Sequence, residues 1–456
     1  RGRAGGAVAH ADEGRAGAPT ARTPSGRVRR PGRAGRSATH TIDGVSTLSA
    51  LSGLATLACA DKSFREVHKH RDERRLDITA PDAARPFLVS CLVTDAQAPL
   101  LVVSANGREA DDLTAELGEL LDDAGAVAQF PSWETLPHER LSPGVDIIGK
   151  RAQVLHNIDD LRIIVTAARG LSQPILQDIE GRAPVHLEED HEYNFDDVVR
   201  SLEFRAYKHV DMVAKRGEFA TRGGIIDVFP TTLDYPVRVE FWGDEVTDIR
   251  QFSVADQRTI PEIEVGRVDI FTARELPITD AVAQRAATLA ATHTGNPALV
   301  ELLTKVSEHI PAEGMEAVLP VLSDAPLITL SEFLPAATHV VMMAPEKIRR
   351  RVEDLEKTDA EFLAAGWEAA AMGADGPLST EGLDTEGSSY RSFESLEVSI
   401  REAGQPLWSW PLPDATVRAA TEAIPLADRR AGKTLLVTAD PDGIVRGPHP
   451  AFESSW

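Results

Sequence analysis

The stretch PLLVVSANGREADDLTAELGELLDD, residues 99–123, places an apolar run directly before an amphipathic segment. The run Pro99–Ser104 has the length of a buried strand, and leucines and acidic residues then fill a helical segment from Arg108 to Asp123. Further buried-strand candidates lie at Leu76–Thr79, Ala126–Phe130 and Arg162–Thr166. Strands that alternate with helices predict a parallel sheet covered by helices on both faces.

A different pattern begins after Pro184. A helix is expected near Phe195–Ala206, and three strands follow it at Gly224–Phe229, Val237–Trp242 and Val246–Val254. Short turns connect these strands, so the pattern predicts a small α+β unit with an antiparallel meander.

The rest of the chain returns to longer elements. Helical segments are expected over 280–309, a strand at 339–343 and a long helix over 346–371. The segment 374–389 is rich in Gly, Ser and acidic residues and has no periodicity, which is typical of a linker. A last small α/β unit starts at Tyr390 and breaks off at the end of the chain.

Composition limits the class of protein. The 456 residues carry a net charge of −23, which argues against tight, sequence-independent binding to duplex DNA. Two cysteines, Cys59 and Cys91, predict neither a disulfide framework nor a zinc site, and a reduced, cytoplasmic setting is expected. No apolar run reaches the roughly 18 residues that a membrane span needs.

The first residues differ from all others. Residues 1–39 hold nine arginines and eight glycines, a composition that cannot bury enough apolar surface to fold. A disordered tail is the favoured interpretation, and a nucleic-acid-binding arm is the alternative.

The segment LDITAPDAARPF, residues 76–87, occupies the position where a doubly wound fold holds phosphate. Its loop has no glycine or lysine, Asp82 would repel an anion, and Pro81 and Pro86 remove two amide donors. We therefore expect no nucleoside triphosphate at this site. The motif AGKT at 431–434 is no substitute, since Ala427 stands where a phosphate loop has its first glycine.

Other motifs also have plain structural explanations. VEFWGDE, residues 239–245, resembles a Mg²⁺-holding strand, but Gly243-Asp244 favours a hairpin turn. His138-Glu139 lacks a second histidine at position 142, so the zinc-protease pattern fails. Trp133 is expected to fill a core.

The strand VRVEFW, residues 237–242, separates into two faces. Alternation sends Val237, Val239 and Phe241 to one side, which is a core face, and Arg238, Glu240 and Trp242 to the other. Arg238 and Trp242 are then roughly 13 Å apart along the strand. With Arg222 nearby in the meander they make a candidate interaction patch, because Arg and Trp are enriched at interface hot spots. A solvated face is the alternative.

Five strings together resemble the N-terminal part of the bacterial transcription-repair coupling factors. These strings are FPSWETLPHERLSP (130–143), HVDMVAKRGEFATRGGIIDVFP (209–230), YPVRVEFWGDEVTDIRQFSVADQRT (235–259), IPAEGMEAVLPVL (310–322) and ITLSEFLP (328–335). The resemblance covers roughly Leu76 to Ser389 and is specific, because long unusual strings agree in order.

The resemblance implies a fold like that of the repair protein UvrB. It predicts an α/β protein with a degenerate helicase-like parallel-sheet domain in two chain segments, an inserted small α+β domain, and a partial further α/β domain. The expected boundaries are 1–45 for the tail, 46–186 and 271–373 for the two segments, 187–270 for the inserted domain, 374–389 for the linker and 390–456 for the incomplete domain.

The resemblance also implies partners. In the family the inserted domain docks the damage-recognition ATPase UvrA, and the docking positions fall on Arg222, Arg238 and Trp242 of this chain. RNA polymerase, double-stranded DNA, ATP and Mg²⁺ belong to family modules that we expect beyond Trp456. No catalytic residue, metal or cofactor is expected within this stretch.

Three hypotheses remain open on the sequence. The first is an adaptor that recruits UvrA, with the arginines pairing to carboxylates and Trp242 filling an apolar recess. The second is an ATPase or helicase active in its own right. The third is a DNA-binding module that uses the arginine-rich tail, with a steep salt dependence as its signature.

Overall fold

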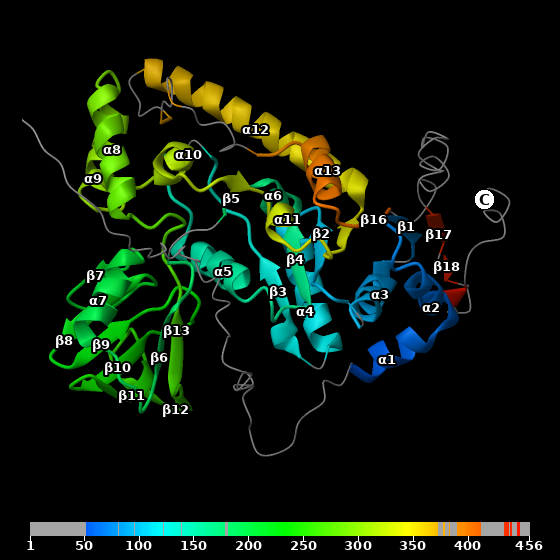
Figure 1. Cartoon of the computed structure of the whole chain (residues 1–456), viewed down its shortest axis with the longest axis horizontal. Helices are drawn as coiled ribbons and strands as arrows, with labels where there is room; N and C mark the ends of the chain where they lie inside the picture. The colour runs from blue at the N-terminus through cyan, green and yellow to red at the C-terminus, as the bar shows by residue number, and fades with distance from the viewer. Residues whose placement is uncertain are drawn as a thin grey trace, which may run out of the picture. The chain divides into compact units, whose positions relative to one another are not determined.

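A seven-stranded, fully parallel sheet forms the centre of one part of the molecule, with helices on both faces (Figure 1). The computed structural model describes residues 52–80, 82–94, 96–121, 123–137, 139–177, 181–372, 377–378, 383, 390–411, 433–436, 438–439 and 445–446. The predicted α/β class with a parallel sheet is confirmed. The strand order is β17-β1-β16-β15-β2-β4-β3. These strands are β1 (Arg75–Thr79), β2 (Leu100–Ser104), β3 (Val127–Phe130), β4 (Ile163–Ala167), β15 (Val340–Met343), β16 (Leu407–Trp410) and β17 (Lys433–Leu436).

Each face of this sheet has its own hydrophobic core. Leu100 and Val102 of β2 belong to one core, and Leu101 and Val103 belong to the other, as the alternation along a strand requires. The first core is covered by α1 (Ser52–Ala60), α2 (Lys62–Lys69), α3 (Arg85–Leu92) and α4 (Gly107–Leu120). The second is covered by α5 (Val145–His156), α6 (Ala168–Ser172), α11 (Leu330–Phe333), α12 (Pro345–Ala371) and α13 (Phe393–Glu402).

Local sequence explains how these helices start. The Asn106 side chain, directly after β2, accepts a hydrogen bond from the Glu109 amide at 3.0 Å and caps α4. Ala110, Leu113 and Leu117 then recur at helical spacing and are buried against the sheet. The strand-then-helix order predicted for residues 99–123 is therefore confirmed.

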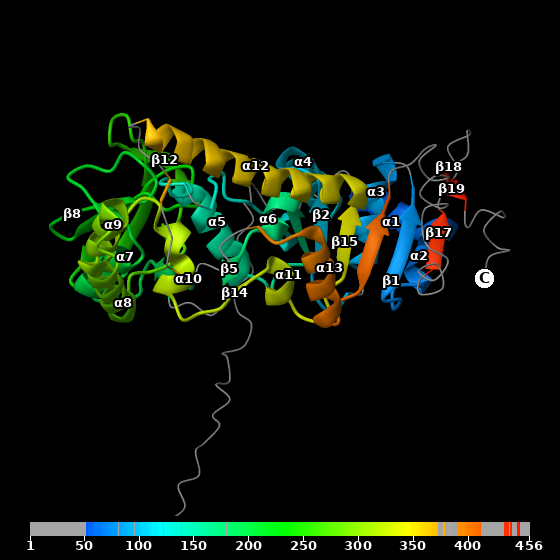
Figure 2. The ribbon, with the colours of Figure 1, turned by 90° about the horizontal axis from the view of Figure 1, so that it is seen from above.

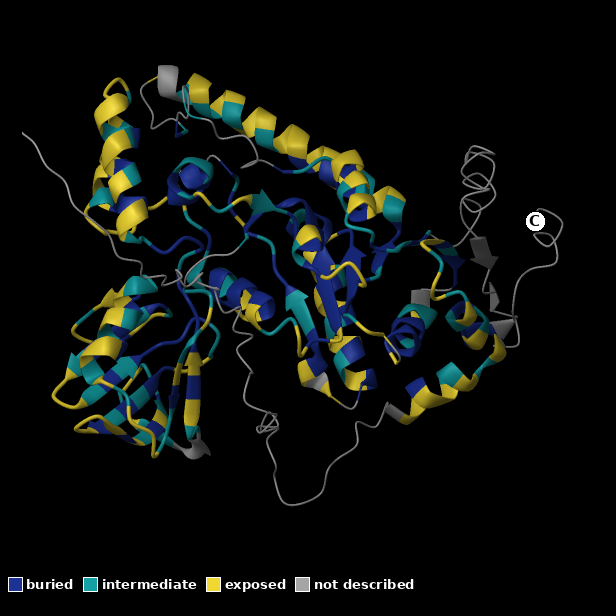
Figure 3. Cartoon of the chain, in the orientation of Figure 1, coloured by how far each residue is buried: buried dark blue, intermediate teal, exposed yellow. Residues whose placement is uncertain are grey.

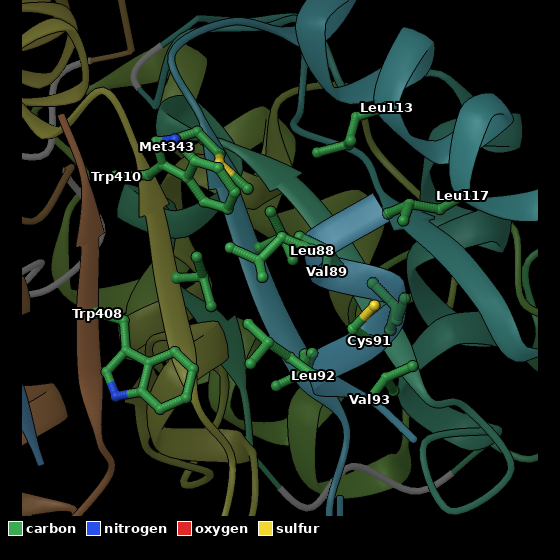
Figure 4. Close-up of a cluster of buried hydrophobic side chains, with 14 of the residues drawn as sticks. Leu88, Val89, Cys91, Leu92, Val93, Leu113, Leu117, Met343, Trp408 and Trp410 are labelled. Atoms are coloured by element: carbon green, nitrogen blue, oxygen red, sulfur yellow. The ribbon is translucent and has the colours of Figure 1, made fainter. Parts of the chain in front are cut away.

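Strand β16 differs from its prediction. It lies between β1 and β15 in the large sheet, where Figure 2 shows its orange arrow between the blue and yellow strands. The boundary predicted at Tyr390 therefore does not separate β16 from the sheet. The physical reason is burial: Trp408 and Trp410 enter the first core together with Met343 and Leu88 (Figure 4).

The two cysteines also differ from their prediction. Cys59 of α1 and Cys91 of α3 form a disulfide, with their Cα atoms 5.3 Å apart. Helix α1 packs against α3 and brings together residues that are 32 positions apart in sequence. The sequence predicted no disulfide framework and a reduced setting, and it did not anticipate this single bond.

Breaking this disulfide has a measurable consequence. We expect Cys59→Ser to lower the free energy of unfolding by about 3 kcal/mol under oxidising conditions, because the bond closes a loop of this length in the unfolded chain. Chemical denaturation with and without a reductant tests it. Wild type and variant should have the same midpoint once the bond is reduced, and a difference that persists in reductant would contradict a disulfide origin.

A third core joins a group of helices to the segment after β3. It contains α8 (Asp280–Thr292), α9 (Pro297–Ser307), η3 (Met315–Val318) and α10 (Leu319–Leu322). Trp133 is buried in this core, as predicted. Leu378, from the segment predicted as a linker, is buried there too, so part of that segment packs against the protein.

Six further short elements in the described part of the chain lie outside residues 185–270. They are η1 (Asp82–Ala84), η2 (Ala124–Ala126), β5 (Ile175–Leu176), β14 (Leu327–Ile328), β18 (Thr438–Ala439) and β19 (Val445–Arg446). The predictions for the tail (1–45), Pro81, His138, most of 374–389 and the Ala431-Gly432 pair lie outside the described residues. Among the helices that are described, none combines the length and apolar character needed to cross a bilayer.

Candidate protein-interaction surface

The segment predicted after Pro184 as an antiparallel meander forms one sheet of six strands, in the order β12-β11-β10-β9-β8-β7, and the pairs are antiparallel except for the parallel β7–β8 pair at one edge. Three of these strands were expected, and β7, β8 and β12 are additional. The strands are β7 (Lys208–His209), β8 (Glu218–Arg222), β9 (Ile225–Val228), β10 (Val237–Trp242), β11 (Glu245–Phe252) and β12 (Thr259–Glu264). A separate pair, β6 (Val185–Glu188) and β13 (Arg267–Ile270), brings the two ends of this segment side by side. We call residues 185–270 the insert.

One face of the six-stranded sheet, the inner face, is a core. Val237, Val239 and Phe241 of β10 are buried there, as alternation predicted, and α7 (Phe195–Phe204) covers them with Leu202. Figure 3 shows buried and exposed residues alternating along these strands.

Tyr207 anchors the base of this core. Its hydroxyl donates to the Phe271 carbonyl at 2.9 Å and accepts from the Thr231 amide at 3.0 Å. Burial raises the pKa of Tyr207 to about 12, so the phenol keeps its proton and its donor role at neutral pH. The hydrogen bonds tie the start of β7, the turn after β9 and the end of β13 to one another.

Two hairpin turns lie at the same end of the sheet. Gly223 has φ +60°, and a Cβ on Gly224 would lie 2.7 Å from the Phe241 carbonyl oxygen, so both positions of the first turn favour glycine. The second turn is Gly243-Asp244, which confirms the predicted hairpin, because Trp242 pairs with Glu245 across it. Since β9 runs antiparallel to β8 and β10, these turns bring Arg222 and Trp242 to one end.

The other face of this sheet, the outer face, carries all three predicted site residues. Arg222 pairs with Ile225, and Ile225 pairs with Glu240, so Arg222 shares a face with Glu240 and with its strand neighbours Arg238 and Trp242. Arg222 and β10 are two strands apart, roughly 10 Å. The structure therefore brings the three side chains onto one surface.

Trp242 and Arg222 are the accessible members of this surface. The Trp242 side chain is 81% exposed, far more than a tryptophan that serves a core. Arg222 is exposed as well, and among the described residues its side chain has no ion pair or hydrogen bond. A charged group and a large apolar group are thus both open at the hairpin end of the outer face.

Arg238 has a different environment. Its Nε and Nη2 atoms donate to the two oxygens of Asp227 at 2.7 and 2.8 Å, a bidentate pair. These hydrogen bonds raise the pKa of Arg238 above its ordinary value. The guanidinium carbon also lies 5.0 Å from the centre of the Phe252 ring, so the side chain is held in place. Arg238 is a fixed group that is only 24% exposed.

Sequence reasoning missed two features of the outer face. Asp248 and Arg250 form an ion pair beside Arg238, on the strand that follows β10. The end of the face opposite the hairpin turns is covered by a small buried cluster that includes Val213, Phe229 and Phe252, whereas Arg222 and Trp242 at the hairpin end are exposed. Alternation along EVTDIRQF (245–252) could not have placed Asp248 and Arg250, because it puts them on the face of the buried Val246, and a shift in the β10–β11 register breaks the alternation.

Comparison with known proteins identifies the family of this segment and relatives of the chain. A family model described as the UvrB interaction domain matches residues 185–276. The transcription-repair-coupling factor of Mycobacterium bovis is 44% identical over 378 residues, which are 79% of this chain and 30% of the relative. The factor of Myxococcus xanthus is 29% identical over 346 residues, which are 71% of this chain and 29% of the relative. The factor of Escherichia coli is 30% identical over 209 residues, which are 45% of this chain and 18% of the relative. The chain thus spans less than a third of the length of these relatives.

Proposed function

We propose that this chain, which belongs to the transcription-repair-coupling factors and corresponds to their N-terminal region, recruits the excision-repair protein UvrA through the outer face of the insert. The observation that carries the proposal is the placement of Arg222, Arg238 and Trp242 on one open sheet face. An exposed tryptophan beside a cation without an intramolecular partner is the kind of residue pair that dominates binding energy at protein interfaces.

The proposed docking works by two contacts of different character. Trp242 enters an apolar recess of UvrA, where removal of its exposed ring from water favours binding. Arg222 pairs with a carboxylate of UvrA, a contact that also directs the approach of the partner. The outer face is built on regular strands, so both side chains are presented by a rigid scaffold.

We expect Arg222→Ala to weaken UvrA binding by roughly thirtyfold or more, because truncation of an interface hot spot has an effect of this order. Titration of the full chain with UvrA measures it. The matched control is Arg200→Ala: Arg200 lies on α7, which covers the inner face, so this variant loses the same charge from the other side of the sheet.

Two outcomes would contradict the docking proposal. Wild-type affinity of Arg222→Ala would remove the outer face from the interface. An equal loss of UvrA affinity in Arg200→Ala would mean that binding depends on the net charge of the chain rather than on a particular surface.

The adaptor role is favoured over an intrinsic ATPase by one contact in the large sheet. The indole N–H of Trp410 donates to the carbonyl of Ala80, directly after β1, at 3.4 Å. A buried tryptophan thus packs at the strand end where a doubly wound fold would place phosphate. For the whole protein we propose contacts with stalled RNA polymerase and double-stranded DNA, and a motor that uses ATP and Mg²⁺, in parts other than the described residues.

A further inference from the structure

Asp227, Glu240 and Asp248 are carboxylates beside Arg238 on the outer face, and they are not equivalent. Asp227 holds Arg238 through two hydrogen bonds, and Asp248 is paired with Arg250. Glu240 lies between them on β10 and acts on Arg238 and Arg250 only through its charge. Removal of Asp227 or of Glu240 therefore changes the charge of the face by the same amount, but only Asp227 determines where a guanidinium points.

Three features of the structure stabilise the Asp227–Arg238 pair: the strand register, an aromatic contact and burial. The two residues lie directly opposite each other in the β9–β10 register, so their backbones set the separation. The Phe252 ring lies against the guanidinium. Both side chains are largely covered, with 24% of Arg238 and 19% of Asp227 exposed, so solvent screens the pair less than it screens an exposed one.

This pairing limits what Arg238 can recognise. Nε and one N–H of Nη2 are used, so among the described residues both N–H groups of Nη1 and the second N–H of Nη2 have no hydrogen-bond acceptor. A partner carboxylate at these donors would meet a guanidinium whose charge Asp227 already neutralises, with the negative charge of Glu240 also acting on it, so the net interaction with a second carboxylate includes repulsion. A carbonyl or hydroxyl oxygen accepts from Nη1 without that repulsion.

We propose that Asp227 is a positioning residue that presents Arg238 as a neutralised, oriented donor for an uncharged oxygen of the partner, whereas Arg222 takes a partner carboxylate. The inference rests on the proposed docking of UvrA, and it differs from the expectation that both arginines pair with carboxylates. On this proposal Arg222 recognises a charge on the partner, and Arg238 recognises the position of a hydrogen-bond acceptor.

The test compares two isosteric changes that remove one negative charge each. If charge alone mattered, both Asp227→Asn and Glu240→Gln would leave the affinity for UvrA unchanged or strengthen it, because the face becomes more positive. We expect Asp227→Asn to weaken binding about tenfold, since an amide cannot accept both hydrogen bonds. Glu240→Gln is expected to bind as wild type or more tightly. Equal or tighter binding by Asp227→Asn would overturn the inference.

Further variants and two further measurements serve as controls for this comparison. Arg238→Lys keeps the charge but loses the bidentate fork, so it should weaken binding like Asp227→Asn, and wild-type affinity of Arg238→Lys would contradict the inference. Thermal melting of each variant identifies loss of fold. The salt dependence of binding should flatten in Arg222→Ala and keep its wild-type slope in the double variant Asp227→Ala with Arg238→Ala, which leaves the net charge of the face unchanged.

The outcomes also separate the two levels of the proposal. If Arg222→Ala binds UvrA as wild type does, the docking proposal itself fails. If Arg222→Ala binds weakly while Asp227→Asn binds tightly, docking stands and the positioning role of Asp227 fails.

Discussion

Trp410→Ala is expected to lower the free energy of unfolding by about 4 kcal/mol, because truncation of a fully buried tryptophan removes a large apolar side chain and leaves a cavity. Trp410 has no exposed surface and lies beside Met343 in the first core (Figure 4). Strand β16 pairs with β1 on one side and β15 on the other, so its side chains belong to the centre of the sheet. The loss should therefore affect the main unfolding transition.

Chemical denaturation followed by circular dichroism measures this change. The control is Trp242→Ala, the same substitution at a side chain that is 81% exposed, for which a change within about 0.5 kcal/mol is expected. If residues 390–411 were a separate unit, Trp410→Ala would instead produce a minor early transition and leave the main midpoint unchanged. That outcome would contradict the placement of β16.

The sequence predicted the elements of the large sheet but not its full membership. Runs such as Leu100–Ser104 and Ile163–Ala167 are apolar except for one small hydroxyl residue each, which is the pattern of a strand buried on both faces. Strand β16 is equally buried, but it has only four residues and pairs with β1 from more than 300 positions away. A local sequence pattern cannot predict a pairing between residues so far apart in sequence. The same is true of the disulfide between Cys59 and Cys91, which are 32 positions apart.

The sequence predicted which face of the sheet carries the candidate site residues, but not the contacts that those residues make. Alternation along VRVEFW correctly separated Arg238 and Trp242 from the core residues, and the Gly-Gly turn placed Arg222 beside them. The bond between Arg238 and Asp227 depends on the register of β9 against β10, which are joined by residues 229–236. That connection is too long to set the register by itself, so packing of the inner face decides it.

Arg151 is the second position where a large effect is expected. It is fully buried on α5, and its guanidinium lies 4.4 Å from the centre of the Phe130 ring. It donates to the carbonyls of Pro131 and Pro174 and to Glu275, which is 7% exposed and lies at the end of the segment matched by the UvrB interaction domain. This cation therefore joins α5 to the chain as it leaves the insert.

We expect Arg151→Met to lower the free energy of unfolding by roughly 3–5 kcal/mol, because it leaves the Glu275 carboxylate buried without its counter-charge. Denaturation of Arg151→Met, Glu275→Gln and the double variant measures the coupling between the two residues. The double variant should be more stable than the sum of the single losses predicts, since it contains no uncompensated buried charge. Additive losses would mean that Arg151 acts through its two carbonyl contacts and the aromatic ring, and that the ion pair with Glu275 does not hold the insert to α5.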